Sequence, residues 1–238
     1  MSLQAHRVGG GHQAVALAML FAVAVLSALA ASGELGFSRS VTPGLIGHYE
    51  RQFGGAVRNR LAGWKEFMID SAGAGDPTGG TSGEAKHLRP VNNFFNRLPS
   101  STDRALWGVD EYWATPAEAL SVNGADCEDF AFAKYFALKE LGMASVRLRM
   151  VYAKQANSSE AHMVLAYYPE PRAEPLILDN LDGRILPASQ RPDLTPVYTF
   201  NDDELQYFQQ GGSPVRLAPS AHRKWREYLE KLVRELAF

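Results

Sequence analysis

The sequence predicts an α+β fold, with helices in the first half of the chain and strands in the second. Three observations lead to this prediction. Before residue 100, apolar residues recur at steps of three and four, which is the helical spacing. Residues 126–141 are apolar nearly all round, which is typical of a buried helix. After residue 146 the apolar residues alternate or form short runs, which is typical of strands.

The first helical pattern spans residues 49–68 and predicts one amphipathic helix. Its apolar face carries Tyr49, Phe53, Val57, Leu61, Trp64 and Met68. The segment 71–83, rich in Gly and Ser, predicts a surface loop. We expect a second helix to begin at Pro90 and to end before Pro99.

Two helices are expected in the centre of the chain. Residues Thr115 to Glu118 form a capping box with proline at the first helical position, and this short helix ends at the turn Asn123-Gly124. The next helix should begin near Asp126 and run to Leu141, with Gly142 as its C-cap. Because this helix is apolar on nearly every side, it should lie in the core.

The second half predicts strands at residues 146–152, 162–168, 176–179 and 196–200, followed by an amphipathic helix. The apolar face of that last helix carries Trp225, Leu229, Leu232, Val233 and Leu236. No internal repeat or second domain is evident, so we expect residues 46–238 to form one domain.

The charge balance argues against a nucleic-acid partner. The 238 residues contain 24 Lys and Arg against 26 Asp and Glu, and no basic stripe is interleaved with aromatic residues. The composition is that of an ordinary globular protein.

The N-terminus predicts export. Arg7 precedes an apolar run at residues 14–29, and Ala28-Leu29-Ala30 supplies the small residues that a signal peptidase requires. We expect residues 1–30 to be a cleaved signal peptide and residues 31–45 to be a flexible leader. The alternatives are a buried helix and a retained anchor, but the run is short against the roughly 20 residues that span a bilayer.

Cys127 is the only cysteine, so an exported chain cannot place it in an internal disulfide. It is either a small buried hydrophobe or a reactive thiol. Its place in the first turn of the buried helix favours the second, because the helix N-terminus stabilises a thiolate, the nucleophilic form. Three groups are candidate oxyanion donors: Asn180, Gln190 and the backbone N–H of Cys127.

His162 is the expected base, because it alone of six histidines opens an apolar strand. If strands 162–168 and 176–179 form a hairpin in which Val164 opposes Ile177, then His162 opposes Asp179. Directly opposed side chains have Cβ atoms about 4.5–5.5 Å apart, so the carboxylate could orient the imidazole. A slip of one residue would put Asp179 on the other face.

Three blocks of sequence resemble the bacterial transglutaminase-like cysteine peptidases, and among them the LapG-type periplasmic adhesin proteases. The blocks are residues 126–136, 161–168 and 176–181, with further likeness at 112–116 and 186–193. Where the family usually has glycine directly before the Asp-Cys pair, this chain has Ala125, with Gly124 one place earlier.

The resemblance implies a papain/transglutaminase-like core, in which the buried helix carries the Cys and packs on an antiparallel sheet carrying the His and Asp. It implies a catalytic triad of Cys127, His162 and Asp179. The implied substrate is the N-terminal region of a large surface adhesin, whose cleavage releases it and disperses biofilm. The resemblance also implies a periplasmic location, a need for Ca²⁺, and inhibition by the periplasmic domain of an inner-membrane cyclic-di-GMP receptor.

Three acids surround the cysteine, at Asp126, Glu128 and Asp129. Acids are common in the first turn of a helix, and no EF-hand pattern is present. With the family likeness they instead predict a Ca²⁺ site, because carboxylate oxygens are preferred calcium ligands. Asp126 and Glu128 are the expected ligands, with Asp129 as a further candidate.

The sequence therefore predicts a cysteine endopeptidase in which Cys127 attacks, His162 transfers the proton and Asp179 orients His162. Two alternatives stay open. The same residues could transfer an acyl group to an amine, as transglutaminases do. The chain could also be a catalytically inactive, calcium-dependent binding module that has kept the fold.

Overall fold

The computed structural model describes residues 41–73, 81–209, 213–235 and 237–238, all within one compact unit. The expected signal peptide at 1–30 lies outside the described residues, as does most of the leader at 31–45. In the part of the chain that is described, no helix has the length and apolar character needed to cross a membrane.

The first helical pattern folds as two helices and not as the expected single one. Helix α2 (Pro43–Phe53) ends at Gly54, whose φ of +85° interrupts the helix, and α3 (Ala56–Gly73) follows. Helix α2 is capped by the Thr42 hydroxyl, and Leu45 is buried. Residues 41–45 therefore belong to the folded domain, which corrects the expected end of the leader.

Helix α4 (Thr81–Phe95) contains Pro90 in its interior, so the prediction that the helix begins at Pro90 was wrong. A proline inside a helix removes one hydrogen bond. Here Leu88, Val91 and Phe95 are all buried, so residues on both sides of Pro90 contribute to the core and the helix continues through it. A short helix, α5 (Asp103–Trp107), was not expected from the sequence.

The two central helices agree with the prediction. Helix α6 (Pro116–Val122) carries the capping box and ends at Asn123, which adopts the left-handed conformation. Helix α7 (Cys127–Glu140) begins one residue after Asp126, and Gly142 follows it with a φ of +92°. Cys127 is therefore the first residue of the buried helix.

Seven strands among the described residues form one sheet in which every pairing is antiparallel. In spatial order they run β4-β3-β2-β1-β5-β6-β7. Their bounds are β1 (Leu148–Gln155), β2 (Ala161–Tyr167), β3 (Leu176–Leu178), β4 (Leu186–Pro187), β5 (Leu194–Phe200), β6 (Leu205–Tyr207) and β7 (Val215–Leu217). The four expected strands are confirmed, while β4, β6 and β7 were not predicted.

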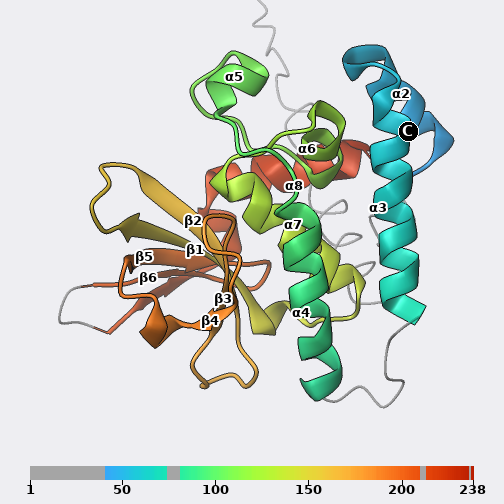
Figure 1. Cartoon of the computed structure of the whole chain (residues 1–238). Helices are drawn as coiled ribbons and strands as arrows, with labels where there is room; N and C mark the ends of the chain where they lie inside the picture. Colours follow the sequence, from blue (N-terminus) through green and yellow to red (C-terminus); the bar gives the residue numbers. More distant parts are fainter. Residues whose placement is uncertain (1–40, 74–80, 210–212, 236) are drawn as a thin grey trace, which may run out of the picture. The chain divides into compact units, whose positions relative to one another are not determined.

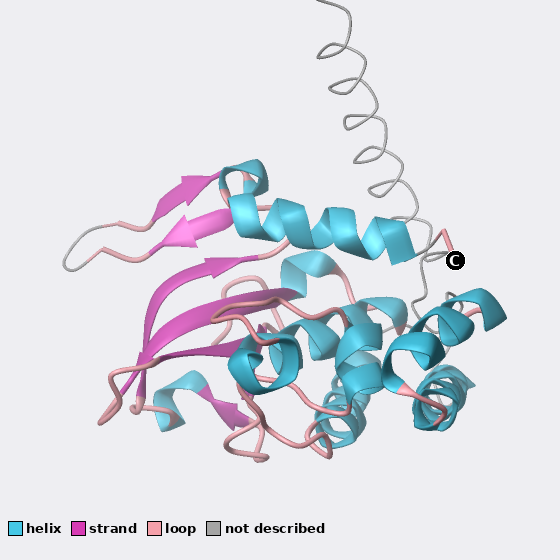
Figure 2. Cartoon of the chain, turned by 90° about the horizontal axis from the view of Figure 1, so that it is seen from above, coloured by secondary structure: helices cyan, strands magenta, loops and turns pink. Residues whose placement is uncertain are grey.

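Helix α7 packs on one face of the sheet, mainly against β2 and also against β1, while α4 packs against α7 from the helical side. Figure 1 shows α7 between the sheet and helices α3 and α4, and Figure 2 shows the strands and helices on separate sides. The expected C-terminal helix is α8 (Arg223–Glu235), with Trp225 and Leu232 buried. The prediction of an α+β fold around one buried helix is confirmed.

Candidate active site

The turn before α7 fixes the position of Cys127. Ala125 is held to the loop after α4, because its N–H donates to the Pro99 carbonyl at 3.2 Å and its carbonyl accepts from Ser101 N–H at 2.9 Å. A Cβ on Gly124 would lie 2.8 Å from Leu106 Cδ2, so a side chain there would displace Leu106. The small residue is therefore needed at 124, and alanine fits at 125, where it is buried.

The Cys127 thiol is half-buried between α7 and β2. It donates a hydrogen bond to Glu128 Oε2 at 3.1 Å, and a backbone hydrogen bond from Met163 also reaches the sulfur. Burial raises the pKa of the thiol, and the negative charge of Glu128 raises it further. Met163 directly follows His162, the expected base, in β2. The contact of the Met163 backbone with the sulfur therefore places Cys127 beside the part of β2 that carries His162.

His162 and Asp179 are joined by a buried hydrogen bond, with 2.8 Å between His162 Nε2 and Asp179 Oδ1. The contact agrees with the prediction, but the predicted register was wrong by two residues. In the sheet Ile177 lies opposite Ala166, where the prediction placed it opposite Val164. Asp179 follows the last residue of β3, and the shift of two leaves it on the same face as His162.

The register differs because of Pro175. Proline has no N–H to donate to a β-ladder, so within a sheet it is disfavoured except at strand ends, edge strands and bulges. Its carbonyl instead accepts a hydrogen bond from Ala188 N–H at 3.0 Å, on the side away from β2. Pairing with β2 begins only at Leu176, opposite Tyr167.

The Asp179 carboxylate has a partner on each oxygen. Oδ1 accepts from His162 and from Leu181 N–H at 3.0 Å, and Oδ2 accepts from Arg191 Nη2 at 2.7 Å. Burial by itself would raise the pKa of Asp179, but the hydrogen bonds from His162, Leu181 N–H and Arg191 outweigh it and lower the pKa to about 2. Asp179 is therefore ionised at neutral pH and can orient an imidazole through Nε2.

An acidic cluster lies next to the thiol. Carboxylate oxygens of Asp103, Asp126 and Glu128 all lie within 4.8 Å of one another. Asp126 and Glu128 were expected from the sequence, whereas Asp103 comes from α5 and was missed. Within the described part of the chain, Asp103 Oδ1 and Asp126 Oδ1 are buried without a hydrogen-bond partner.

The electrostatics of this cluster suit a divalent cation. Burial raises the pKa of Asp126 to about 9, with the charges of Glu128 and Asp103 as further causes. Burial and nearby acids also raise the pKa of Asp103. Oxygen-only ligands with several negative charges are the donor set that Ca²⁺ prefers, so these three residues fit that ion.

Asp129 has a different role from its two acidic neighbours. Its Oδ1 accepts from Ala114 N–H at 2.7 Å, and its Oδ2 accepts from Asp126 N–H at 3.4 Å. It is buried and lies outside the acidic cluster. Asp129 thus satisfies two backbone donors, Ala114 N–H before α6 and Asp126 N–H at the start of α7, which is a structural role.

The expected oxyanion donors differ in their surroundings. The N–H of Cys127 lies in the first turn of α7, where backbone donors have no partner within the helix. Gln190 is exposed, and Asn180 is half-buried directly after Asp179. A thiol, an imidazole and a carboxylate in this arrangement can carry out nucleophilic attack on a carbonyl with proton transfer.

Comparisons with known proteins agree with this chemistry. The family of bacterial transglutaminase-like cysteine proteinases matches residues 70–200. Among solved structures, EGTA-treated LapG of Legionella pneumophila is 36% identical with a TM-score of 0.66, covering 78% of this chain and 95% of its own. Its calcium-bound form is 37% identical with a TM-score of 0.63, covering 79% and 97%. No curated protein matches the sequence significantly.

Proposed function

Because this chain belongs to the bacterial transglutaminase-like cysteine proteinases, and is thus a cysteine peptidase of the LapG type, we propose that Cys127, His162 and Asp179 are its catalytic triad. Cys127 is the only cysteine in the sequence, so no other residue can supply the thiol. The observation that carries the proposal is the buried His162–Asp179 hydrogen bond, adjacent to the strand residue that contacts the sulfur.

The roles follow from which atoms are already engaged. Asp179 binds His162 at Nε2, so Nδ1 is the ring nitrogen that exchanges a proton with the thiol. His162 takes the proton of Cys127, the thiolate attacks the peptide carbonyl, and the imidazolium then protonates the leaving amine. Water, activated by His162, hydrolyses the thioester. The N–H of Cys127 is suited to the oxyanion because α7 leaves it without a helical partner.

We also propose that Asp103, Asp126 and Glu128 bind Ca²⁺. Support comes from the calcium-bound form of the similar LapG and from the two buried oxygens without partners. The ion would supply positive charge that compensates three neighbouring carboxylates. The chain's own contribution is to join α5 to the start of α7, so that the loop holding Cys127 keeps its shape.

The proposed location rests on the N-terminal sequence, and the proposed substrate and inhibitor rest on the family likeness. The N-terminal pattern of residues 1–30 supports export to the periplasm. The family likeness supports a large surface adhesin as substrate, cut in its N-terminal region so that the adhesin is released and biofilm disperses. It also supports the periplasmic domain of an inner-membrane cyclic-di-GMP receptor as the inhibitor.

The test is cleavage of the N-terminal region of such an adhesin by the chain without residues 1–30. Cys127→Ala and His162→Ala should each abolish cleavage while the fold is retained. His48→Ala is the matched control, because His48 hydrogen-bonds only to Gln52 among the described contacts, on α2 away from the sheet. Cleavage by Cys127→Ala above a tenth of wild type would contradict the triad.

The same assay separates hydrolysis from acyl transfer. With a lysine analogue in excess, a peptidase should give the same two fragments in the mass spectrum as without it. A new mass equal to a fragment joined to the amine would identify transferase activity instead.

A further inference from the structure

We propose that Arg191 is a positioning residue for the triad: fixed by Asp193, its guanidinium holds the Asp179 carboxylate so that Oδ1 faces His162. The inference rests on the proposed function and goes beyond it, because it adds two residues that act through Asp179. Arg191 and Asp193 lie between η2 (Ala188–Gln190) and β5, and Asp179 follows β3, so the fold joins separate segments here.

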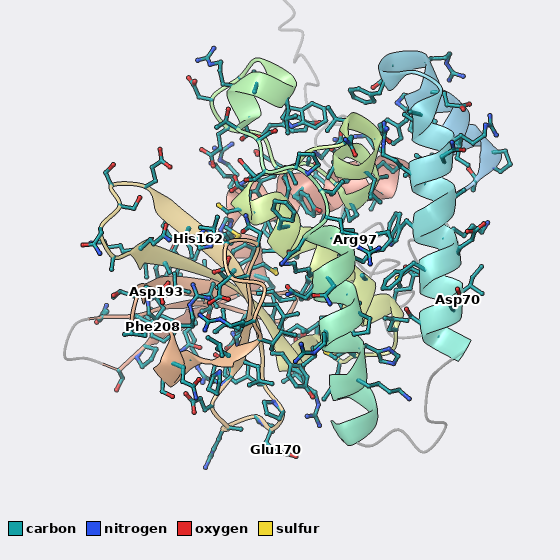
Figure 3. All side chains as sticks on the ribbon, in the orientation of Figure 1. Asp70, Arg97, His162, Glu170, Asp193 and Phe208 are labelled. Atoms are coloured by element: carbon teal, nitrogen blue, oxygen red, sulfur yellow. The ribbon has the colours of Figure 1, made fainter. Side chains whose placement is uncertain are left out.

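The contacts of Arg191 form a chain that ends at the imidazole. Arg191 Nη2 lies 2.7 Å from Asp179 Oδ2 and 2.7 Å from Asp193 Oδ2, and Arg191 Nε lies 2.9 Å from Asp193 Oδ1. Asp193 thus binds the guanidinium with both oxygens, a pairing whose planar geometry fixes orientation as well as distance. In Figure 3, Asp193 and His162 both lie on the sheet side of the domain.

Asp179 needs such support because it lies just beyond the end of β3. The last residue of β3 that pairs with β2 is Leu178, so the ladder does not fix Asp179 itself. A carboxylate held only through Oδ1 could turn about its side-chain bonds and lose the imidazole. With Arg191 on Oδ2, the position of Oδ1 is determined. The side chain of Asp179 is fully buried and that of Arg191 is 6% exposed, so water does not compete for this contact.

The charges around Asp179 are largely compensated. A lone guanidinium would weaken the attraction of Asp179 for a protonated His162, but Asp193 compensates the charge of Arg191. A further charged group that faces Asp179 is Lys134 on α7, whose pKa burial lowers to about 7 despite the opposing effect of Asp179. Lysine at that pKa is only partly protonated near neutral pH, so it places less than a full positive charge beside Asp179.

A purely structural role would make different predictions. Arg191 also joins the β4–β5 connection through its backbone, since its N–H donates to Ala188 and its carbonyl accepts from Leu194 N–H. Those bonds involve no side-chain atom, so a substitution at 191 leaves them in place. A positioning role should appear in kcat and in the state of the His162 ring, whereas a structural role should appear only in stability.

The experiment compares Arg191→Gln, Arg191→Lys and Asp193→Asn with the control Arg184→Gln in the calcium-loaded chain without residues 1–30. Arg184 is a matched control, because it pairs with Asp182 three residues after Asp179 but is exposed. Steady-state cleavage of the adhesin region gives kcat and KM, thermal unfolding gives stability, and ¹⁵N NMR reports the His162 ring.

For Arg191→Gln we expect kcat to fall about 10- to 100-fold with KM changed less than about 3-fold, the pattern of a lost orienting contact. Arg191→Lys should recover part of kcat, because lysine keeps the charge but not the fork. Asp193→Asn, at a side chain that is 40% exposed, should fold normally and reduce kcat by about 3- to 10-fold. The His162 Nε2–H signal should shift in all three variants and stay unchanged in Arg184→Gln.

The inference is overturned if the three variants match Arg184→Gln in kcat, or if kcat falls while the His162 signal is unchanged. Should Arg191→Gln fail to fold, Arg191→Lys and Asp193→Asn decide the question by the same two readouts. A Cys127→Ala chain assayed in parallel distinguishes a failure of the proposed function from a failure of this inference alone. If it still cleaves, the proposed function fails; if it is inactive while the Arg191 variants are normal, only this inference fails.

Discussion

His162 and Asp179 are in contact although they are not directly opposed in the β2–β3 ladder. Their hydrogen bond spans 2.8 Å, while the register pairs Leu165 with Leu178 and so places Asp179 diagonally from His162. Diagonal neighbours on one face are still within reach of long side chains. The contact therefore depends on the ladder register and on the groups that hold Asp179 beyond the strand end.

Asp179→Asn should reduce kcat by about 10- to 1,000-fold, less than His162→Ala, because nucleophile and base remain while orientation and charge are lost. The amide would also weaken the contact with Arg191. Asp182→Asn is the control, since Asp182 is a nearby acid paired with exposed Arg184. Asp182→Asn should keep the kcat of wild type. If Asp182→Asn instead loses kcat while Asp179→Asn keeps it, Asp182 is the orienting acid.

Removal of calcium should suppress activity, and Mg²⁺ should restore it poorly, because Mg²⁺ requires a smaller octahedral site and retains its waters. Asp103→Asn should weaken Ca²⁺ binding about 10-fold or more in isothermal titration calorimetry, because it removes one of three charged ligands. Asp110→Asn, in the loop after α5, should bind as wild type does, since Asp110 pairs with Arg104. Equal affinities for the two variants would exclude Asp103 as a ligand.

Glu235 in α8 should make the folded state less stable as the pH rises. It accepts hydrogen bonds from the Tyr49 and Thr115 hydroxyls, and burial, followed by the charge of Glu118, raises its pKa from 4.5 to about 7. The folded state thus binds the proton more tightly than the unfolded state. Stability from this group is complete below pH 4.5 and is lost as the pH rises to about 7.

Replacing this acid by a neutral isostere should remove that pH dependence. Glu235→Gln should exceed wild type in the free energy of unfolding at pH 8 by up to about 3 kcal/mol, and should match it near pH 4. Glu230→Gln, an exposed position on the same helix, should track wild type at both pH values. If Glu235→Gln and wild type have the same urea midpoint and slope at pH 8, ionisation of Glu235 does not destabilise the folded state.

Much of the fold could be predicted because its long elements carry strong patterns. The all-round apolar character of α7 and the capping box of α6 gave correct bounds within a residue or two. The short elements α5, β4, β6 and β7 were missed, since two to five residues carry no recognisable period. The start of α4 was predicted wrongly at Pro90. Burial of apolar side chains on both sides of Pro90 outweighs the loss of one helical hydrogen bond, so the helix continues through it.

The site could be predicted where its residues adjoin a pattern. Cys127 opens a helix and His162 lies at the start of a strand, so each had a local signal. Asp103 had no such signal, and the family-like block 186–193 gave no sign of the contact made by Arg191, because each residue reaches the site from a distant segment through side-chain contacts. The register was missed because Pro175 is held by a hydrogen bond from Ala188, which directly follows β4 and is distant in sequence.

The most direct test of the triad is the trapping of Cys127 by a peptide carrying the adhesin sequence before the cleaved bond and ending in a thiol-reactive vinyl sulfone. Intact mass spectrometry should show one adduct on Cys127 in wild type and in His48→Ala. The rate of addition should fall at least about 100-fold in His162→Ala, which lacks the base. Equal rates of addition in wild type and His162→Ala would contradict the account.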